Sequence, residues 1–75
     1  MQATVLSVEN RRLLVFDRER RQTVVVHTQD ARRFRPGNLV CIRFSGAMTN
    51  SIPPQISAIF ISRIPRFSPW QNRCR

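Results

Sequence analysis

Arginine is the residue type in this chain with the clearest capacity for binding chemistry. The sequence holds 13 basic residues, all of them arginine, against four acidic residues, and its formal net charge is +9. A guanidinium group holds phosphate or carboxylate oxygens through two parallel hydrogen bonds and can stack on nucleobases. A genome rich in G and C would exchange lysine for arginine, but it would not remove acidic residues. The net charge therefore predicts a polyanionic partner.

The arginines gather in two stretches that we expect to be exposed. One group lies on the first two expected turns and consists of Arg11, Arg12, Arg18, Arg20 and Arg21. The other surrounds a short helix-capable segment, at residues 32–35. A phenylalanine inside the second group is the one ring in the expected folded part that is suitably placed to stack on a base. We predict that these side chains and one further arginine bind nucleic acid: Arg20, Arg21, Arg32, Arg33, Phe34, Arg35 and Arg43.

Catalytic and metal-binding chemistry has little support. His27 is the only histidine, and Asp17 or Asp30 could orient its ring, but no motif places a nucleophile beside it. The two cysteines, Cys41 and Cys74, lie at no recognised zinc-ligand spacing from His27 and make no disulfide framework beyond a single potential bond. We interpret Cys41 as a small packing residue, and we expect no enzyme activity, no metal and no cofactor.

Five stretches have the composition of β-strands. Residues 2–9, 12–17, 22–28, 39–45 and 55–64 are rich in apolar and β-branched side chains, which fit a pleated sheet. Between the third and fourth stretches, Asp30 can cap one helical turn, which Pro36 and Gly37 would end. Phe16 and Phe44 lie in apolar runs and are expected in the core. The first strand has no glycine, so a sharp bend there would need closure near Ser7 or a bulge.

This element order is that of an OB-fold, which places its helical segment between strands three and four. We therefore predict an all-β, five-stranded OB-type Greek-key barrel with one short helical turn over residues 1–64. Residues 65–75 are expected to form a flexible basic tail, or a linear docking element built on Phe67 and Trp70. An SH3-like or Sm-like barrel is the alternative fold.

Residues 48–61 carry a more specific pattern, Met-Thr-Asn-Ser-Ile-Pro-Pro-Gln-Ile-Ser-Ala-Ile-Phe-Ile. With the preceding residues 35–40, Arg-Pro-Gly-Asn-Leu-Val, this stretch resembles the second half of small OB-fold proteins of Gram-positive bacteria. In that family a Thr-x-Ser-x-Pro-Pro-Gln-Ile-x-Ala segment leads into the last strand. The resemblance implies a fold, and it carries over no catalytic residue because those relatives are largely of unknown function.

These observations predict a small basic binding module without catalysis, whose partner is single-stranded nucleic acid or structured RNA. The alternative is a protein-interaction module in which the charge only maintains solubility, and association with an anionic surface is a third hypothesis. Residues 1–8 lack the features of an export signal, and no apolar run reaches the 18 or so residues of a membrane span. We therefore expect a cytoplasmic protein. The oligomeric state and the exposed barrel face stay open, because the first three strands are apolar on both faces.

Overall fold

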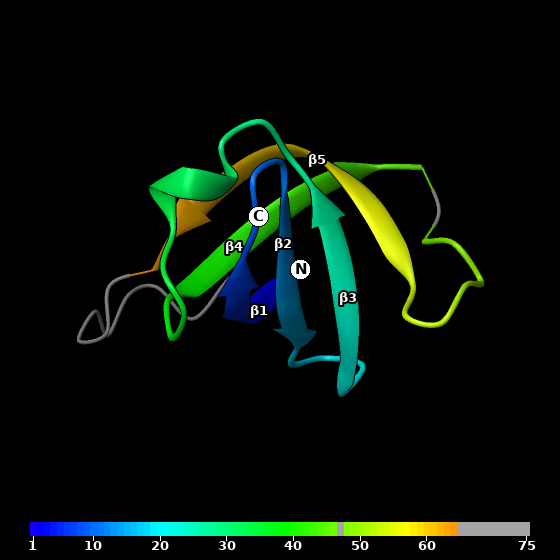
Figure 1. Cartoon of the computed structure of the whole chain (residues 1–75). Coiled ribbons are helices and arrows are strands. Elements are labelled where there is room, and N and C mark those ends of the chain that lie inside the picture. The colour runs from blue at the N-terminus through cyan, green and yellow to red at the C-terminus, as the bar shows by residue number, and fades with distance from the viewer. Residues whose placement is uncertain (47, 65–75) are drawn as a thin grey trace.

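The computed structural model describes residues 1–46 and 48–64, and five β-strands form a closed barrel within them (Figure 1). The strands are β1 (Gln2–Val8), β2 (Arg12–Asp17), β3 (Gln22–His27), β4 (Leu39–Ser45) and β5 (Gln55–Arg63). Their order around the barrel is β1-β2-β3-β5-β4, in which β3 and β5 are parallel and the other neighbours are antiparallel. One 3₁₀ turn, η1 (Ala31–Arg33), lies between β3 and β4. The predicted OB-type barrel is confirmed.

Alternation along β2 and β3 builds the centre of the core. Leu13 and Val15 of β2 are fully buried, and so are Val24 and Val26 of β3. The register places Leu13 opposite Val26 and Val15 opposite Val24, so these four side chains lie on the inner face of the same strand pair. The barrel interior is therefore filled by aliphatic side chains, as a barrel of this size requires.

A bulge in β1 supplies the bend that the sequence analysis anticipated. The pairing of β1 with β2 shifts between Val5 and Ser7, and Leu6 is the extra residue. On the N-terminal side of the shift, Val5 exchanges hydrogen bonds with the segment that precedes β4. The N–H of Gly37 donates to the carbonyl of Val5 at 2.8 Å, and the N–H of Val5 donates to Asn38 at 2.9 Å. Gly37 has a φ of +92°, a conformation that glycine adopts without strain.

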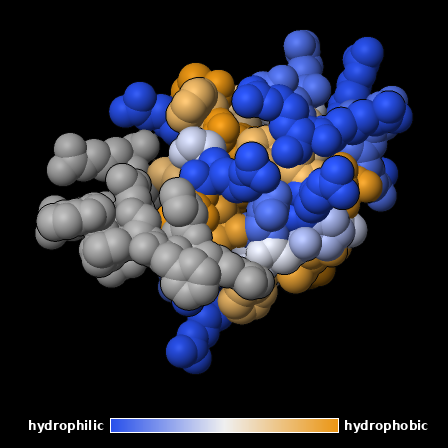
Figure 2. All heavy atoms as spheres, turned by 90° about the vertical axis from the view of Figure 1, so that its left-hand side faces the viewer, coloured by the Kyte–Doolittle hydropathy of each residue, from blue (hydrophilic) through white to orange (hydrophobic). Residues whose placement is uncertain are grey.

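The segment that contains η1 is packed into the core. Ala31 is fully buried and Phe34 is 6% exposed, and both belong to the same hydrophobic cluster as the barrel interior. The neighbouring side chains of Arg32 and Arg33 are exposed. Figure 2 shows the side of the molecule that carries η1, from which hydrophilic side chains project with hydrophobic surface between them.

Cys41 in β4 is buried, as expected of a packing residue, but its sulfur takes part in a disulfide bond. The interpretation of Cys41 as a simple packing thiol is therefore corrected. The tail predicted for residues 65–75, with Phe67, Trp70 and Cys74, lies outside the described residues. Within the described ranges, no helix has the length and apolar character needed to cross a membrane.

Candidate functional site

The arginines selected from the sequence lie at several places around the barrel. Arg20 and Arg21 belong to the β2–β3 turn, at one end of β3, whereas Arg32 and Arg33 lie in η1, beyond its other end. Six residues of β3 separate the two groups, a length of about 20 Å at roughly 3.3 Å per residue. Two local clusters are therefore present, and no single patch contains both.

The remaining members of the predicted set differ in their accessibility. Arg35 is exposed in the loop after η1. Arg43 is exposed on β4, a strand that pairs with β5 and β1 but not with β2 or β3. Phe34 is the clear correction. Its ring packs into the core and is not available to stack on a base, because the chain turns inward after η1.

The outer face of β2 and β3 provides the aromatic surface that the sequence analysis assigned to Phe34. Since Leu13 and Val15 point inward, Leu14 and Phe16 point outward, and Phe16 is 37% exposed. Phe16 lies between Thr4 of β1 and Thr23 of β3 in the strand register. The expectation that Phe16 belongs to the core is therefore wrong. We call this outer face, with Leu14, Phe16, Thr23 and Val25, the platform.

A hollow of about 330 Å³, the platform hollow, lies beside Leu14 and Val25. Its walls come from the β1–β2 loop, from the platform and from the β4–β5 loop. The lining residues include Ser7, Glu9, Arg12, Leu14, Val25 and Pro53. Phe16 lies on the same face of β2 as Leu14, two residues further along the strand, and it is not among the residues that line this hollow.

The β4–β5 loop is held against the platform by its own hydrogen bonds. The N–H of Val25 donates to the carbonyl of Pro54 at 2.9 Å, which joins the loop to β3. Within the loop, the hydroxyl of Thr49 accepts from the N–H of Gln55 at 2.9 Å, and the hydroxyl of Ser51 donates to the carbonyl of Pro53 at 2.9 Å. These hydrogen bonds join the part of the loop that precedes Gln55 to β3 and to itself.

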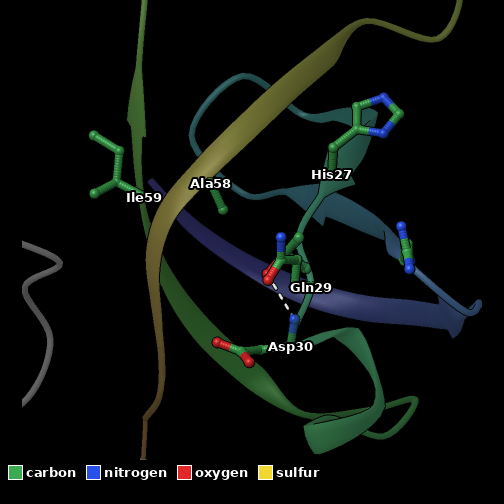
Figure 3. Close-up of a pocket in the computed structure, with 7 residues that line it drawn as sticks. His27, Gln29, Asp30, Ala58 and Ile59 are labelled. Carbon is green, nitrogen blue, oxygen red and sulfur yellow. Dashed lines mark hydrogen bonds between the residues drawn. The ribbon is translucent and has the colours of Figure 1, made fainter.

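Two further hollows adjoin the first. The arginine hollow, about 480 Å³, is lined by Glu9, Asn10, Arg11, Arg12 and His27. The β5 hollow, about 560 Å³, is lined by residues that include Arg11, His27, Thr28, Asp30, Ala58 and Ile59. Figure 3 shows the β5 hollow, with Ala58 and Ile59 on one strand and with His27, Gln29 and Asp30 on the segment that faces it.

Charge in the arginine hollow is partly compensated. The guanidinium of Arg12 is paired with the carboxylate of Glu9. Arg11 is exposed and forms no ion pair with any residue of the described ranges. His27 is joined to β5 by a hydrogen bond of 2.7 Å between its Nε2 and Oε1 of Gln55. Arg11 is therefore the cation in these hollows that is best placed to receive an anion.

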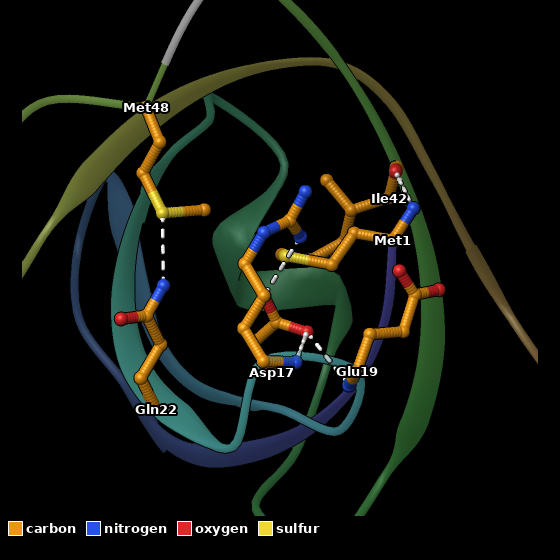
Figure 4. Close-up of polar contacts among 7 residues, drawn as sticks. Met1, Asp17, Glu19, Gln22, Ile42 and Met48 are labelled. Carbon is orange, nitrogen blue, oxygen red and sulfur yellow. Dashed lines mark hydrogen bonds and ion pairs between the residues drawn. The ribbon is translucent and has the colours of Figure 1, made fainter.

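Arg20, by contrast, is engaged in the structure of its own turn. Figure 4 shows this turn with Asp17 and Glu19. Its Nη1 donates to Oδ2 of Asp17 at 3.0 Å, and Asp17 is fully buried. Oδ1 of Asp17 also accepts from the N–H groups of Glu19 at 2.9 Å and Arg20 at 3.3 Å. Asp17 thus holds the β2–β3 turn in place.

Among the described residues no group of three or more potential metal ligands lies close together.

Comparison of this chain with protein-family models, with curated proteins and with solved structures gives no match. The resemblance to small bacterial OB-fold proteins therefore stays a prediction. A fold of this kind hosts many unrelated activities, so function has to be argued from the site.

Proposed function

We propose that this protein is a non-catalytic module that binds single-stranded nucleic acid across the platform. The observation that carries the proposal is the position of the platform hollow, on the β2–β3 face between the β1–β2 and β4–β5 loops. OB barrels characteristically receive oligonucleotides and oligosaccharides at this place.

Two properties of the site favour a nucleic acid over an oligosaccharide. Phe16 offers a partly exposed ring, and an unpaired base can stack on such a ring whatever its identity. The chain is also strongly basic, and Arg11 and Arg18 are exposed in the connections that flank β2. Arginines in these positions can neutralise the phosphates on either side of a stacked base.

The arginines away from the platform have a different part in this proposal. Arg21, Arg32, Arg33, Arg35 and Arg43 surround the barrel and raise the local concentration of a polyanion by their common field. A structured RNA could reach more of them than a short single strand could.

We propose the cytoplasm as the location, where nucleic acid is accessible.

A second candidate function is protein binding through β5. Ile59 and Phe60 are 63% and 62% exposed although they are adjacent in one strand, because the β4–β5 pairing is irregular next to them. Exposed large apolar residues of this kind are typical of protein-protein contacts. In this alternative the positive charge only maintains solubility.

The experiment compares Phe16→Ala with Phe60→Ala in fluorescence anisotropy with a labelled single-stranded oligonucleotide over a salt series. We expect Phe16→Ala to weaken binding about 5- to 150-fold, because a stacked base contributes about 1–3 kcal/mol. Phe60→Ala removes an equally large ring from β5, and it should leave the affinity within about twofold. Heparin serves as the competitor for nonspecific charge.

Three results would contradict the proposal. They are absence of binding near physiological salt, complete displacement by heparin, and equal effects of the two substitutions. If about five phosphates are contacted, the logarithm of the affinity should fall against the logarithm of salt concentration with a slope near −3.5.

A further inference from the structure

We infer that Leu6, at the β1 bulge, is a second base-contacting residue, which widens the platform and gives it a preference for purines. The inference rests on the proposed function and deepens it, because it names the class of base that the platform receives. It adds to the platform a residue of β1, a strand that so far has only been described as part of the barrel wall.

The bulge sets the direction of consecutive side chains in β1. Val5 is 1% exposed, so simple alternation would direct Ser7 inward and Val8 outward. The register shift reverses this order, because Ser7 is opposite Leu14, which points outward, and Val8 packs against the core. The outer face of β1 therefore carries two residues in succession, Leu6 and Ser7.

Leu6 lies beside two platform residues of the neighbouring strand. Thr4 is opposite Phe16, and Ser7 is opposite Leu14. Leu6 stands between Thr4 and Ser7, so on β1 it is level with the space between the two platform side chains, at a strand separation of about 4.8 Å. Leu6, Leu14 and Phe16 thus form one apolar patch across β1 and β2, which we call the base patch.

The bulk of Leu6 is not used by the barrel interior. Leu6 is 45% exposed, and within residues 1–46 and 48–64 it belongs neither to the core cluster nor to the side chains packed against it. Single apolar side chains are normal on a protein surface, whereas adjacent ones mark binding sites. Bulges are also common next to functional sites, where they redirect a side chain. Leu6 therefore has the position expected of a ligand contact.

The width of the base patch favours a purine. A single ring such as that of Phe16 accepts any base, and the differences between bases on such a surface come from stacking strength. The favourable free energy of an apolar contact grows with the area that it removes from water. A purine has two fused rings and can cover Leu6 as well as Phe16, whereas a pyrimidine has only one ring. Leu6 therefore adds more to the binding of a purine.

Arg18 places a positive charge at one end of the base patch. Phe16 points outward and Asp17 is fully buried, so Arg18 is the next residue directed outward. Its N–H donates to the carbonyl of Gln2 at 3.1 Å, which fixes its backbone beside β1. Its side chain is exposed and forms no ion pair with any residue of the described ranges. At about 7 Å from Phe16 along the chain, it is suitably placed for the phosphate of a stacked nucleotide.

The test compares two labelled strands of about five nucleotides, a length within the site sizes of OB barrels. One strand contains only thymidine, and the other has a single adenine at its centre, because several adenines in a row would stack on one another. Anisotropy gives the affinity of each strand for the unaltered protein and for Leu6→Ala, Leu6→Met and Ile59→Ala. Ile59 is the matched control, since it is an exposed aliphatic residue next to a pairing irregularity, but it lies on β5. Circular dichroism checks the fold of each variant, and Leu6→Thr replaces Leu6→Ala if the latter unfolds.

We expect the unaltered protein to bind the adenine-containing strand about threefold or more tighter than the thymidine strand. Leu6→Ala should reduce this ratio to less than about 1.5, whereas Leu6→Met and Ile59→Ala should preserve it. A loss of stability alone would weaken both strands equally and leave the ratio unchanged.

Two results would overturn the assignment of Leu6 while the platform proposal stands. They are equal affinity of the unaltered protein for both strands, and a ratio that is the same in Leu6→Ala as in the unaltered protein. A ratio that falls equally in Ile59→Ala would also overturn it, since that residue is outside the base patch. Absence of binding to either strand, even at low salt, would instead remove the proposed function itself.

Discussion

At the scale of single residues, Asp17 shows how an acidic side chain can be structural in a basic protein. It is the one fully buried charged residue of the described ranges, and its carboxylate accepts three hydrogen bonds from the turn that follows β2. A buried carboxylate is tolerated only when its oxygens are satisfied in this way. The turn also contains Arg21, which has a φ of +55°, so Asp17 helps to hold a strained backbone conformation.

Asp17→Ala should lower the free energy of unfolding by about 2–3 kcal/mol, because hydrogen bonds to a charged group contribute roughly 1.5–3 kcal/mol and two backbone donors lose their acceptor. Urea denaturation monitored by circular dichroism measures the change. Glu19→Gln is the control, since the side chain of Glu19 is exposed and its substitution should cost less than about 0.5 kcal/mol. Equal costs for the two variants would show that Asp17 does not organise the turn.

At the scale of elements, the two faces of β2 differ in what they contact. Its inward residues pack against β3 in the core, and its outward residues form the platform. Leu13 and Leu14 are identical and adjacent, yet the first is fully buried and the second is half-buried on the outer face. Under the proposed function, the pair therefore separates stability from binding within one strand.

Leu13→Ala should destabilise the barrel by about 2–5 kcal/mol, because it leaves a cavity in the core. Leu14→Ala should cost clearly less stability and should weaken oligonucleotide binding, since Leu14 lines the platform hollow. Urea denaturation and anisotropy measure the two effects. The assignment of the two faces fails if Leu14→Ala costs as much stability as Leu13→Ala and leaves the affinity unchanged.

At the scale of the whole molecule, the positive charge is dispersed around the barrel, so under the proposed function it acts as a field more than as a set of contacts. The arginines of η1 and those of the β2–β3 turn lie beyond opposite ends of β3, and Arg43 lies on another wall of the barrel. A field from dispersed charges weakens as salt shortens the screening length, from about 10 Å at 0.1 M to about 3 Å at 1 M. Direct stacking contacts do not weaken in this way.

Reversing the charge of η1 with Arg32→Glu and Arg33→Glu should therefore weaken oligonucleotide binding at low salt, and the difference from the unaltered protein should shrink as salt rises. Anisotropy over a salt series measures this, with Phe16→Ala as the comparison whose effect should persist. A loss that is undiminished at high salt would place these two arginines in direct contact with the ligand, as the sequence analysis predicted.

The amino-acid sequence by itself indicated the strands, the short helical turn between the third and fourth, and the need for either a closure near Ser7 or a bulge in the first strand; the structure shows that it is a bulge. These features follow from local causes, namely β-branched runs, a Pro-Gly stop and the absence of glycine from the first strand. The strand ends predicted from sequence differ from those of the structure by one residue at most, at β1, β3 and β5. The excess of arginine is likewise a property of the sequence alone.

Only the tertiary structure decided which aromatic side chains are buried and which lie on the outer face. Phe16 was expected inside and Phe34 outside, and the structure reverses both. The physical reason is that β2 is apolar on both alternating faces, so its pattern is compatible with either orientation until Leu13 and Val15 pack against β3. The parallel contact of β3 with β5 is likewise a tertiary feature, because it joins segments about 30 residues apart in sequence through the long-range closure of the barrel.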